Sequence, residues 1–316
     1  MVKALVTGGL GFIGSHLAER LLDIGYEVRI ADLPWRDTSN ISHFVDQVEV
    51  MKADLKYQEM CDKVCKGVDA VFHFAAQADV KKSLDDHLAD LNNNLLPTIY
   101  LLDSMQREGI RDMVFASSSA VYGDPTVVPT PEDAGLNPIS LYGASKSSAE
   151  AFARAHMEFS PIRFWAFRFA NPIGERNKKG VVWNFVNFLA SDPTTLPILG
   201  DGQQRKGFFY ISDCIDGILT GYRLSSERFN AFNIASGRAL TVDELATIVI
   251  EEMGLDNSKV KRVYAGGKRG WIGDIPVSDL STEKLKALGW RQLVSPEEAI
   301  RKVVRWSRNQ IEAPLA

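Results

Sequence analysis

Residues 1–17 read Met1-Val-Lys-Ala-Leu-Val-Thr-Gly-Gly-Leu-Gly-Phe-Ile-Gly-Ser-His-Leu17, in which a short apolar run leads into a glycine-rich turn and an amphipathic segment. That order predicts a strand, a tight turn and a helix. Glycines at this spacing allow a sharp bend, a close approach of the backbone to a pyrophosphate, and tight packing of helix on strand. The N–H groups at the start of the helix and the positive end of its dipole attract phosphate. The residues predicted to form this dinucleotide site are Gly8, Gly11, Phe12, Ile13 and Gly14.

The next predicted strand covers residues 27–31 and ends in Asp32, about twenty residues after the glycine turn. A carboxylate at that place can accept hydrogen bonds from both ribose hydroxyls of an adenosine. It would repel a 2′-phosphate, so we expect NAD as the cofactor rather than NADP. Arg36, four residues later, is the group that could instead bind such a phosphate.

Two further strands are expected at 48–52 and 69–74, and short motifs at their ends also point to the cofactor. Asp54-Leu55, after the first strand, is placed to reach the adenine ring, although Asp54 could equally cap the following helix. Ala75-Ala76, after the second strand, is small enough for a ligand to approach the backbone. We expect both pairs to line the cofactor site.

The composition is that of an ordinary globular protein of 316 residues, with 24% charged residues and a net charge of −4. This charge provides no basic surface for nucleic acid or for an anionic membrane. No apolar run reaches the length of a membrane span and no signal peptide precedes the first strand, so we expect a cytoplasmic protein. Cys61, Cys65 and Cys214, with five scattered histidines, predict neither a disulfide framework nor a metal site.

Strands alternate with helices over the first half of the chain, which predicts an α/β fold with a doubly wound, parallel Rossmann sheet. From residue 171 onward the segments are shorter, and glycine and proline interrupt them. We therefore expect an NAD-binding Rossmann domain over 1–170. A smaller α/β substrate-binding lobe is expected mainly over 171–316, with strands near 207–235 returning to the main sheet.

The chemistry is predicted at Tyr142-Gly-Ala-Ser-Lys146, where a tyrosine and a lysine lie one helical turn apart on the same face. A nearby ammonium favours the tyrosinate, which can act as a general base. The pattern alone is weak, because a second copy occurs at Tyr264-Ala-Gly-Gly-Lys268. The first copy follows Ser118, which lies just past the end of a predicted parallel strand, where ligands bind in such sheets. We therefore expect Ser118, Tyr142 and Lys146 to be the catalytic residues.

A series of further motifs runs along the chain. The full set is Gly8-x-x-Gly-x-x-Gly14, Asp32, Asp54-Leu55, His73-Phe-Ala-Ala76, Ser117-Ser-Ser-Ala-Val-Tyr-Gly123, Tyr142-x-x-x-Lys146, Arg168-Phe-Ala-Asn171-Pro, Gly200-Asp-Gly-Gln-Gln-Arg205 and Arg269-Gly-Trp-Ile-Gly-Asp274. Together these motifs resemble those of the extended short-chain dehydrogenases/reductases that act on nucleotide sugars. Within that family the chain is similar to UDP-glucose 4-epimerases, and the resemblance covers nearly its whole length.

The resemblance implies roles for individual residues. Tyr142 would be the acid–base group, Lys146 its partner and a ligand of the nicotinamide ribose, and Ser118 a catalytic hydroxyl that contacts the sugar. Asn94 matches an asparagine at the cofactor side of a family helix, although Leu95-Leu96-Pro97-Thr98 departs from the family's pattern. The implied substrate-binding residues are Asn171, Arg205 and Arg269 for the diphosphate or sugar, and Ser278 beside the sugar ring.

The implied mechanism is a redox cycle on a UDP-sugar. Tyr142 takes the proton of the C4 hydroxyl while Ser118 holds that oxygen, and hydride passes from C4 to NAD. The 4-keto sugar then turns over, and hydride returns to its other face.

The resemblance also implies a homodimer, formed by the helices expected at 90–107 and 142–159 of each subunit. The second helix carries more apolar surface than one sheet-packed face needs. The alternative is that this helix is buried within its own subunit. Its apolar residues are Ala144, Ala151, Phe152, Ala155 and Phe159.

Other functions stay open at this point. The related 4,6-dehydratases place Asp-Glu where this chain has Ser119-Ala120, so elimination of water is not expected. A net NAD-dependent oxidoreductase would keep the same residues, whereas a non-catalytic NAD-binding scaffold would be expected to lose one of them. Within the epimerases, the sugar could be glucose, N-acetylglucosamine or glucuronate. Ser278 would leave room for a 2-acetamido group, and Arg176 or Lys178 could face a carboxylate.

Overall fold

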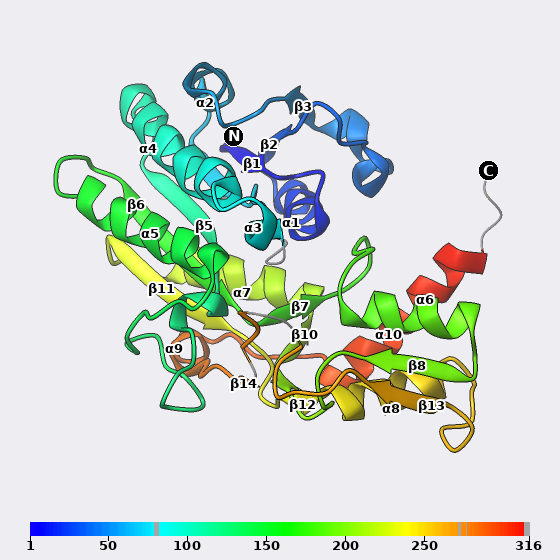
Figure 1. The fold of residues 1–316 in the computed structure, drawn as a ribbon. Coiled ribbons are helices and arrows are strands. Elements are labelled where there is room, and N and C mark those ends of the chain that lie inside the picture. The colour runs from blue at the N-terminus through cyan, green and yellow to red at the C-terminus, as the bar shows by residue number, and fades with distance from the viewer. Residues whose placement is uncertain (79–81, 271–272, 276, 313–316) are drawn as a thin grey trace.

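The computed structural model describes residues 1–78, 82–270, 273–275 and 277–312. Its centre is a seven-stranded sheet in the order β11-β6-β5-β4-β1-β2-β3, and every neighbouring pair is parallel (Figure 1). The strand order reverses between β1 and β4, which is where open parallel sheets bind ligands. The predicted doubly wound α/β fold is confirmed. The strands are β1 (Lys3–Thr7), β2 (Glu27–Asp32), β3 (Glu49–Lys52), β4 (Ala70–His73), β5 (Asp112–Ser118), β6 (Arg163–Phe169) and β11 (Phe229–Ile234).

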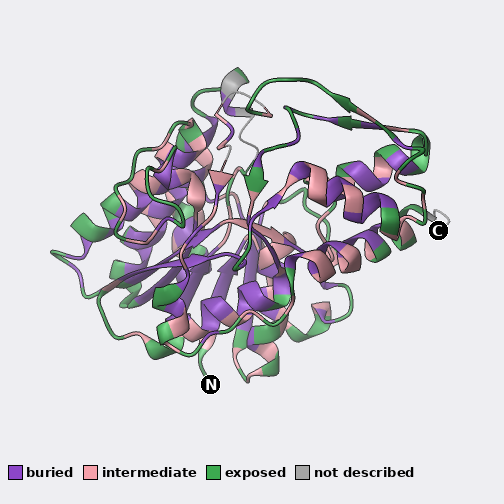
Figure 2. Ribbon diagram, turned by 90° about the horizontal axis from the view of Figure 1, so that it is seen from below, coloured by how far each residue is buried: buried purple, intermediate pink, exposed green. Residues whose placement is uncertain are grey.

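Helices cover both faces of this sheet. One core lies under α2, α4 and α5 and includes Leu5 and Val71, and the other lies under α1 and α7 and includes Val6 and Phe72. Successive strand residues point to opposite faces, so these near-continuous apolar strands serve two cores at once. Figure 2 shows the buried strands between the two layers. The helices are α1 (Phe12–Asp23), α2 (Gln58–Cys65), α4 (Leu96–Glu108), α5 (Leu141–His156) and α7 (Ile211–Leu224).

The helix expected at 90–107 divides into two parts in the structure. A π-helical turn, η3 (Leu91–Leu95), is followed by α4, which has Pro97 in its first turn. Proline is tolerated there because the first N–H groups of a helix have no partner within it. The remaining short elements are η1 (Ser39–Ile41), η2 (Val45–Gln47), α3 (Lys82–Asp85), η4 (Ser119–Tyr122) and α9 (Glu283–Ala287).

The second half forms a smaller lobe with a core of its own, at the lower right of Figure 1. The helices there are α6 (Val181–Ser191), α8 (Val242–Glu252) and α10 (Pro296–Glu312). Its strands pair as β7 (Asn171–Ile173) with β10 (Phe208–Tyr210), β8 (Thr195–Ile198) with β13 (Lys261–Tyr264), and β9 (Arg205–Lys206) with β12 (Leu240–Thr241) and β14 (Val277–Ser278). Of the strands expected near 207–235, β11 joins the main sheet, whereas β10 pairs with β7 in the lobe. The division at residue 170 stays a prediction.

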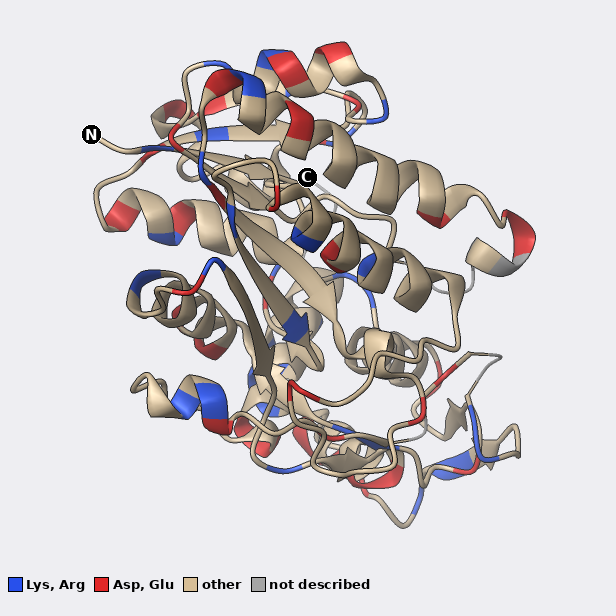
Figure 3. Ribbon diagram, turned by 90° about the vertical axis from the view of Figure 1, so that its left-hand side faces the viewer, with Lys and Arg blue, Asp and Glu red and all other residues tan. Residues whose placement is uncertain are grey.

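Membrane-spanning helices, metal-ligand clusters and cysteines were considered over the residues that the structure describes. There, no helix has both the length and the apolar character needed to cross a membrane, and no cluster of three metal-ligating side chains occurs. Cys61, Cys65 and Cys214 are buried free thiols. Figure 3 turns the left-hand side of Figure 1 toward the viewer. Acidic and basic residues are mixed over the helices in this view, and few lie on the strands.

Candidate active site

The glycine turn joins β1 to α1 and leaves no space for side chains. Gly8 has φ +68°, and a Cβ there would lie 2.6 Å from the backbone nitrogen of Ala75 at the end of β4. A Cβ on Gly14 would overlap the carbonyl oxygen of Gly8. Helix α1 has no side-chain cap at Gly11 and no acidic residue in its first turn. This end of α1, which begins with Phe12 and Ile13, therefore fits a pyrophosphate.

Asp32 ends β2 beside this turn, and its carboxylate is held in place by backbone groups. One oxygen accepts from the N–H of Leu10 at 2.9 Å and the other from the N–H of Leu33 at 2.8 Å. These bonds fix the buried side chain at the edge of the turn, where an adenosine ribose would lie. Arg36 is exposed, and its carbonyl oxygen accepts from the Lys52 side chain.

The pairs after β3 and β4 lie at the same edge of the sheet. Asp54 accepts from the N–H of Lys56 at 3.1 Å, whereas α2 begins later, with Tyr57 as its N-cap. Asp54 therefore closes a turn before the helix and does not cap it. Leu55 is buried in the core beneath, Ala75 packs against the glycine turn, and Ala76 is exposed.

Asn94 lies in the π-helical turn η3 and is buried. Its side-chain oxygen accepts from the N–H of Gln77 at 2.7 Å, and its amide donates to Asp90 and to Ser145 Oγ, both at 3.1 Å. These bonds join the segment after β4 to α5. Asn94 therefore bridges the two segments, and its partner on α5, Ser145, directly precedes Lys146.

Helix α5 begins against the turn η4. Ser140 caps it by accepting from the N–H of Gly143 at 3.1 Å. Gly143 is required because a Cβ there would overlap the carbonyl oxygen of Ala120. This close approach brings the phenol of Tyr142 next to Ser118, whose hydroxyl lowers the pKa of the phenol.

Lys146 lies one helical turn after Tyr142 and is almost fully buried. Its Nζ donates to the carbonyl oxygen of Ala116 at 2.7 Å and lies 5.9 Å from the centre of the Tyr142 ring. The three predicted catalytic residues thus meet at the carboxyl end of β5. The glycine turn follows β1, two strands along the same edge of the sheet.

Burial dominates the protonation of this group. It raises the pKa of Tyr142 to about 12, although the hydrogen bond with Ser118 lowers it. It lowers the pKa of Lys146 to about 7, although the carboxylates of Asp90 and Glu150 raise it. The expectation that the lysine brings down the tyrosine pKa is therefore not met by the lysine alone, because desolvation disfavours both ions. The tyrosinate needs further positive charge beside it at neutral pH.

Asn171 opens β7, and its backbone N–H donates to the carbonyl oxygen of Gly207 at 3.1 Å. It lines a cavity of about 200 Å³ between β7 and α6, together with Lys179, Trp183 and Phe208. The lining of this cavity thus combines polar and apolar side chains.

The two basic residues of β9 point in different directions, because neighbouring strand residues face opposite sides. The exposed side chain of Arg205 donates to the carbonyl oxygen of Ala239 at 3.2 Å. Lys206 Nζ is 2.6 Å from Asp274 Oδ1. Arg269 donates to the Asp274 carbonyl oxygen and, at 2.6 Å, to Asp124. The structure therefore brings Lys206, which the motif comparison missed, to Arg269; strand alternation was the signal that could have found it.

Ser278 pairs with Lys206 across β14 and β9, and its Oγ lies 3.3 Å from Ser119 Oγ. Ser119 follows Ser118 directly, so Ser278 lies close to the end of β5, where the predicted catalytic residues meet. The cavity beside it is about 10 Å³ in volume. Trp271, Ile272 and Pro276 of the surrounding motifs lie outside the described residues.

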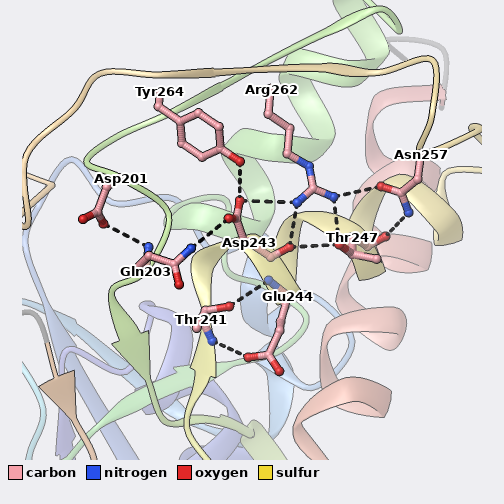
Figure 4. A network of polar contacts seen from close by, with 9 residues as sticks. All are labelled: Asp201, Gln203, Thr241, Asp243, Glu244, Thr247, Asn257, Arg262 and Tyr264. Carbon is pink, nitrogen blue, oxygen red and sulfur yellow. Dashed lines mark hydrogen bonds and ion pairs between the residues drawn. The ribbon is translucent and has the colours of Figure 1, made fainter.

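The second tyrosine motif lies far from this group, on β13. Tyr264 donates to Asp243 of α8 at 2.7 Å, and the side chain of Gln203 donates to the same carboxylate at 3.1 Å. Figure 4 shows this network. Arg262 joins Asp243 to Asn257. This network fastens the Gly200–Arg205 turn to α8 and β13, so Tyr264 serves the structure of the lobe.

The family model described as "NAD dependent epimerase/dehydratase family" matches residues 4–235. This chain belongs to that family. It is therefore an NAD-dependent enzyme, and its glycine turn and Asp32 fit the adenosine diphosphate part of that cofactor.

The relatives that match this family member span nearly its whole length. A putative UDP-glucose 4-epimerase from Methanocaldococcus jannaschii is 32% identical, over 96% of this chain and 98% of that protein. The UDP-glucose 4-epimerase of Thermotoga maritima, solved with UDP-glucose, has a TM-score of 0.89 and 30% identity, over 98% of this chain and 100% of that one. A UDP-N-acetylglucosamine 4-epimerase from Methanobrevibacter ruminantium has a TM-score of 0.87 and 28% identity, over 98% and 99%. Other matches are named as decarboxylases or dehydratases, so the family alone leaves the reaction open.

Proposed function

We propose that this enzyme interconverts the C4 epimers of a UDP-hexose, with UDP-glucose and UDP-galactose as its substrate pair. The observation that carries the proposal is the meeting of Ser118, Tyr142 and Lys146 at the end of β5. The next two residues, Ser119 and Ala120, supply no carboxyl group that could help to eliminate water. The 4-epimerases among the relatives support the same reaction.

In the proposed reaction, Tyr142 Oη removes the proton of the sugar C4 hydroxyl and later returns it. Ser118 lies next to Tyr142 and can hold the sugar oxygen during both transfers. Lys146 Nζ lies 5.9 Å from the centre of the phenol ring, so its ammonium form would add to the positive charge that a tyrosinate needs there. Bound NAD supplies the redox chemistry, the reversible acceptance of a hydride from a sugar carbon.

We assign the UDP diphosphate to the basic residues around Asp274. Arg269 is suited to bidentate binding of phosphate, and Lys206 adds a second cation across the carboxylate. Arg205 is expected in the same role; in this structure its exposed side chain donates to the carbonyl oxygen of Ala239. Asn171 and the cavity beside it would take another part of the nucleotide sugar.

Incubation of the protein with separate UDP-sugars, without added NAD, tests this function. We expect the 4-epimer of UDP-glucose to form, and also that of UDP-N-acetylglucosamine, because serine at 278 leaves more room than an aromatic side chain. The cavity beside Ser278 holds about one water in volume, so the acetamido group must move neighbouring side chains. UDP-glucuronate is the competing substrate, but Arg176 is paired with Glu19 of α1.

Ser278→Tyr should lower kcat/KM for UDP-N-acetylglucosamine at least tenfold and leave UDP-glucose nearly unchanged, since an added ring excludes the larger sugar. An unchanged rate on the acetamido sugar would show that position 278 is not a specificity residue. If wild type acts on neither sugar, the proposed function is wrong.

We also propose a homodimer that is formed by helices α4 and α5 of each subunit. These two helices lie side by side on the outer surface of the molecule, at the left of Figure 1. Phe152 and Phe159 are 50% and 67% exposed, and Ala151 and Ala155 beside them are exposed too. This apolar face argues against a helix buried within its own subunit. Light scattering at micromolar concentration should give twice the mass of 35.0 kDa. Phe152→Arg should reduce that mass to one subunit, and a monomeric wild type would refute the dimer.

A further inference from the structure

Helix α5 contacts the end of β5 at three successive turns. The three side chains are spaced four residues apart, so they lie on one face of the helix. Each meets one of three consecutive β5 residues: Tyr142 meets Ser118, Lys146 donates to Ala116 at 2.7 Å, and Glu150 accepts from Ser117 Oγ at 2.6 Å. The third contact lies outside the set of residues that the sequence motifs identified.

Arg168, on the neighbouring strand β6, holds the carboxylate of Glu150 from the other side. Its Nε donates to one oxygen at 3.1 Å and a terminal nitrogen donates to the other at 2.7 Å. The two side chains are only 4% and 3% exposed. Arg168 also donates to Tyr122 Oη at 2.8 Å, so the pair is part of the wall behind η4. A bidentate fork of this kind fixes the direction of the carboxylate as well as its charge.

Lys146 is surrounded by groups from several elements. The carboxylates are Asp90, beside η3, and Glu150, one turn along α5, and both oppose the effect of burial on the pKa of Lys146. His73 of β4 also faces it, but burial lowers the His73 pKa to about 3 and leaves the imidazole neutral. Tyr142 is the fourth titratable group. Of the two carboxylates, Glu150 is the one that also bonds directly to β5 and β6.

We propose that Glu150 is a positioning residue for catalysis: held by Arg168 and Ser117, it fixes α5 on the end of β5 and, together with Asp90, adds negative charge beside Lys146. The inference rests on the proposed function in that it assumes a catalytic use of charged Lys146. The contacts of Glu150 themselves do not depend on the substrate. Its effect would reach the substrate through Lys146 and through Ser117, which holds the adjacent Ser118 in place.

Titration of the protein labelled with ¹³Cε-lysine tests the charge directly, without turnover. In wild type, Lys146 should titrate near neutrality, and its signal is identified by its loss in Lys146→Arg. Glu150→Gln should move this titration about one unit lower, since an adjacent anion is removed. Glu150→Asp should restore most of the shift. Glu132→Gln is the matched control, because Glu132 bonds to the nearby Asn233 N–H at 2.9 Å but contributes no charge interaction to Lys146.

Turnover then separates this inference from the proposed function. Glu150→Gln should move the alkaline limb of the kcat profile in the same direction as the lysine titration, with the UDP-sugar KM unchanged. A purely structural role would lower activity equally at every pH. Ser117→Ala keeps the charges of Glu150 and Lys146. It should lower kcat about tenfold without moving the alkaline limb of the kcat profile. It tests the contact with β5 even if Glu150→Gln does not fold.

An unshifted Lys146 titration in Glu150→Gln, or wild-type kcat in Ser117→Ala, would overturn the inference. If wild type fails to epimerise any UDP-sugar while the lysine titration shifts as expected, the proposed function fails and the charge relation of Glu150 to Lys146 stands.

Discussion

Tyr142→Phe should lower kcat about a thousandfold while the NAD content and the UDP-sugar KM stay close to wild type. The substitution removes only the hydroxyl that moves the C4 proton. The ring remains beside Lys146, and the start of α5 is still held by Ser140 and by the packing of Gly143 on η4. Transition-state stabilisation is therefore lost with little change in ground-state binding. Steady-state kinetics and the nucleotide released on denaturation measure the two effects.

Tyr264→Phe is the matched control, because it removes the hydroxyl of the second Tyr-x-x-x-Lys motif. That hydroxyl bonds to Asp243 on a half-exposed side chain, so kcat should change less than twofold. If Tyr142→Phe retained near wild-type turnover, or if both variants lost activity alike, Tyr142 would not be the acid–base group.

Gly8→Ala should yield protein with less than a tenth of the wild-type NAD content and no activity without added cofactor. The methyl group would meet the backbone of Ala75, which cannot move aside as a flexible side chain can, so the turn must open. The positive φ adds strain of roughly 1–2 kcal/mol. Quantifying the nucleotide released from equal amounts of folded protein gives the result.

Gly25→Ala separates strain from obstruction. Gly25 also has a positive φ, +89°, but a Cβ there meets nothing within 4 Å. Gly25→Ala should therefore lose thermal stability through the backbone strain alone, and the protein should keep its NAD. Equal NAD loss in both variants would mean that the turn at Gly8 is not a cofactor cradle.

The features that could be predicted from the sequence are those written in short segments. The glycine turn and Asp32 are joined through Leu10, within one β-α-β unit, and Tyr142 and Lys146 share one helix. Such spacing is fixed by local geometry, so a motif translates directly into a site. The parallel sheet could be predicted for the same reason, since its apolar strands alternate with helices.

Residues whose roles depend on packing between distant segments could not be predicted in this way. Glu150 and Arg168 meet only because α5 covers β6. Arg168 opens one of the motifs, but no motif includes Glu150. Arg205 and Lys206 are adjacent in sequence, and the phase of a two-residue strand decides which of them faces Arg269. The pKa of Tyr142 also depends on burial, which spacing alone does not reveal.

The most direct measurement of the central claim uses UDP-glucose deuterated at C4, incubated with the purified protein without added NAD. We expect UDP-galactose that keeps the deuterium at C4, because the hydrogen removed from that carbon is returned to it inside the closed site. Formation of no UDP-galactose, or release of the deuterium into water, would contradict the proposed epimerisation.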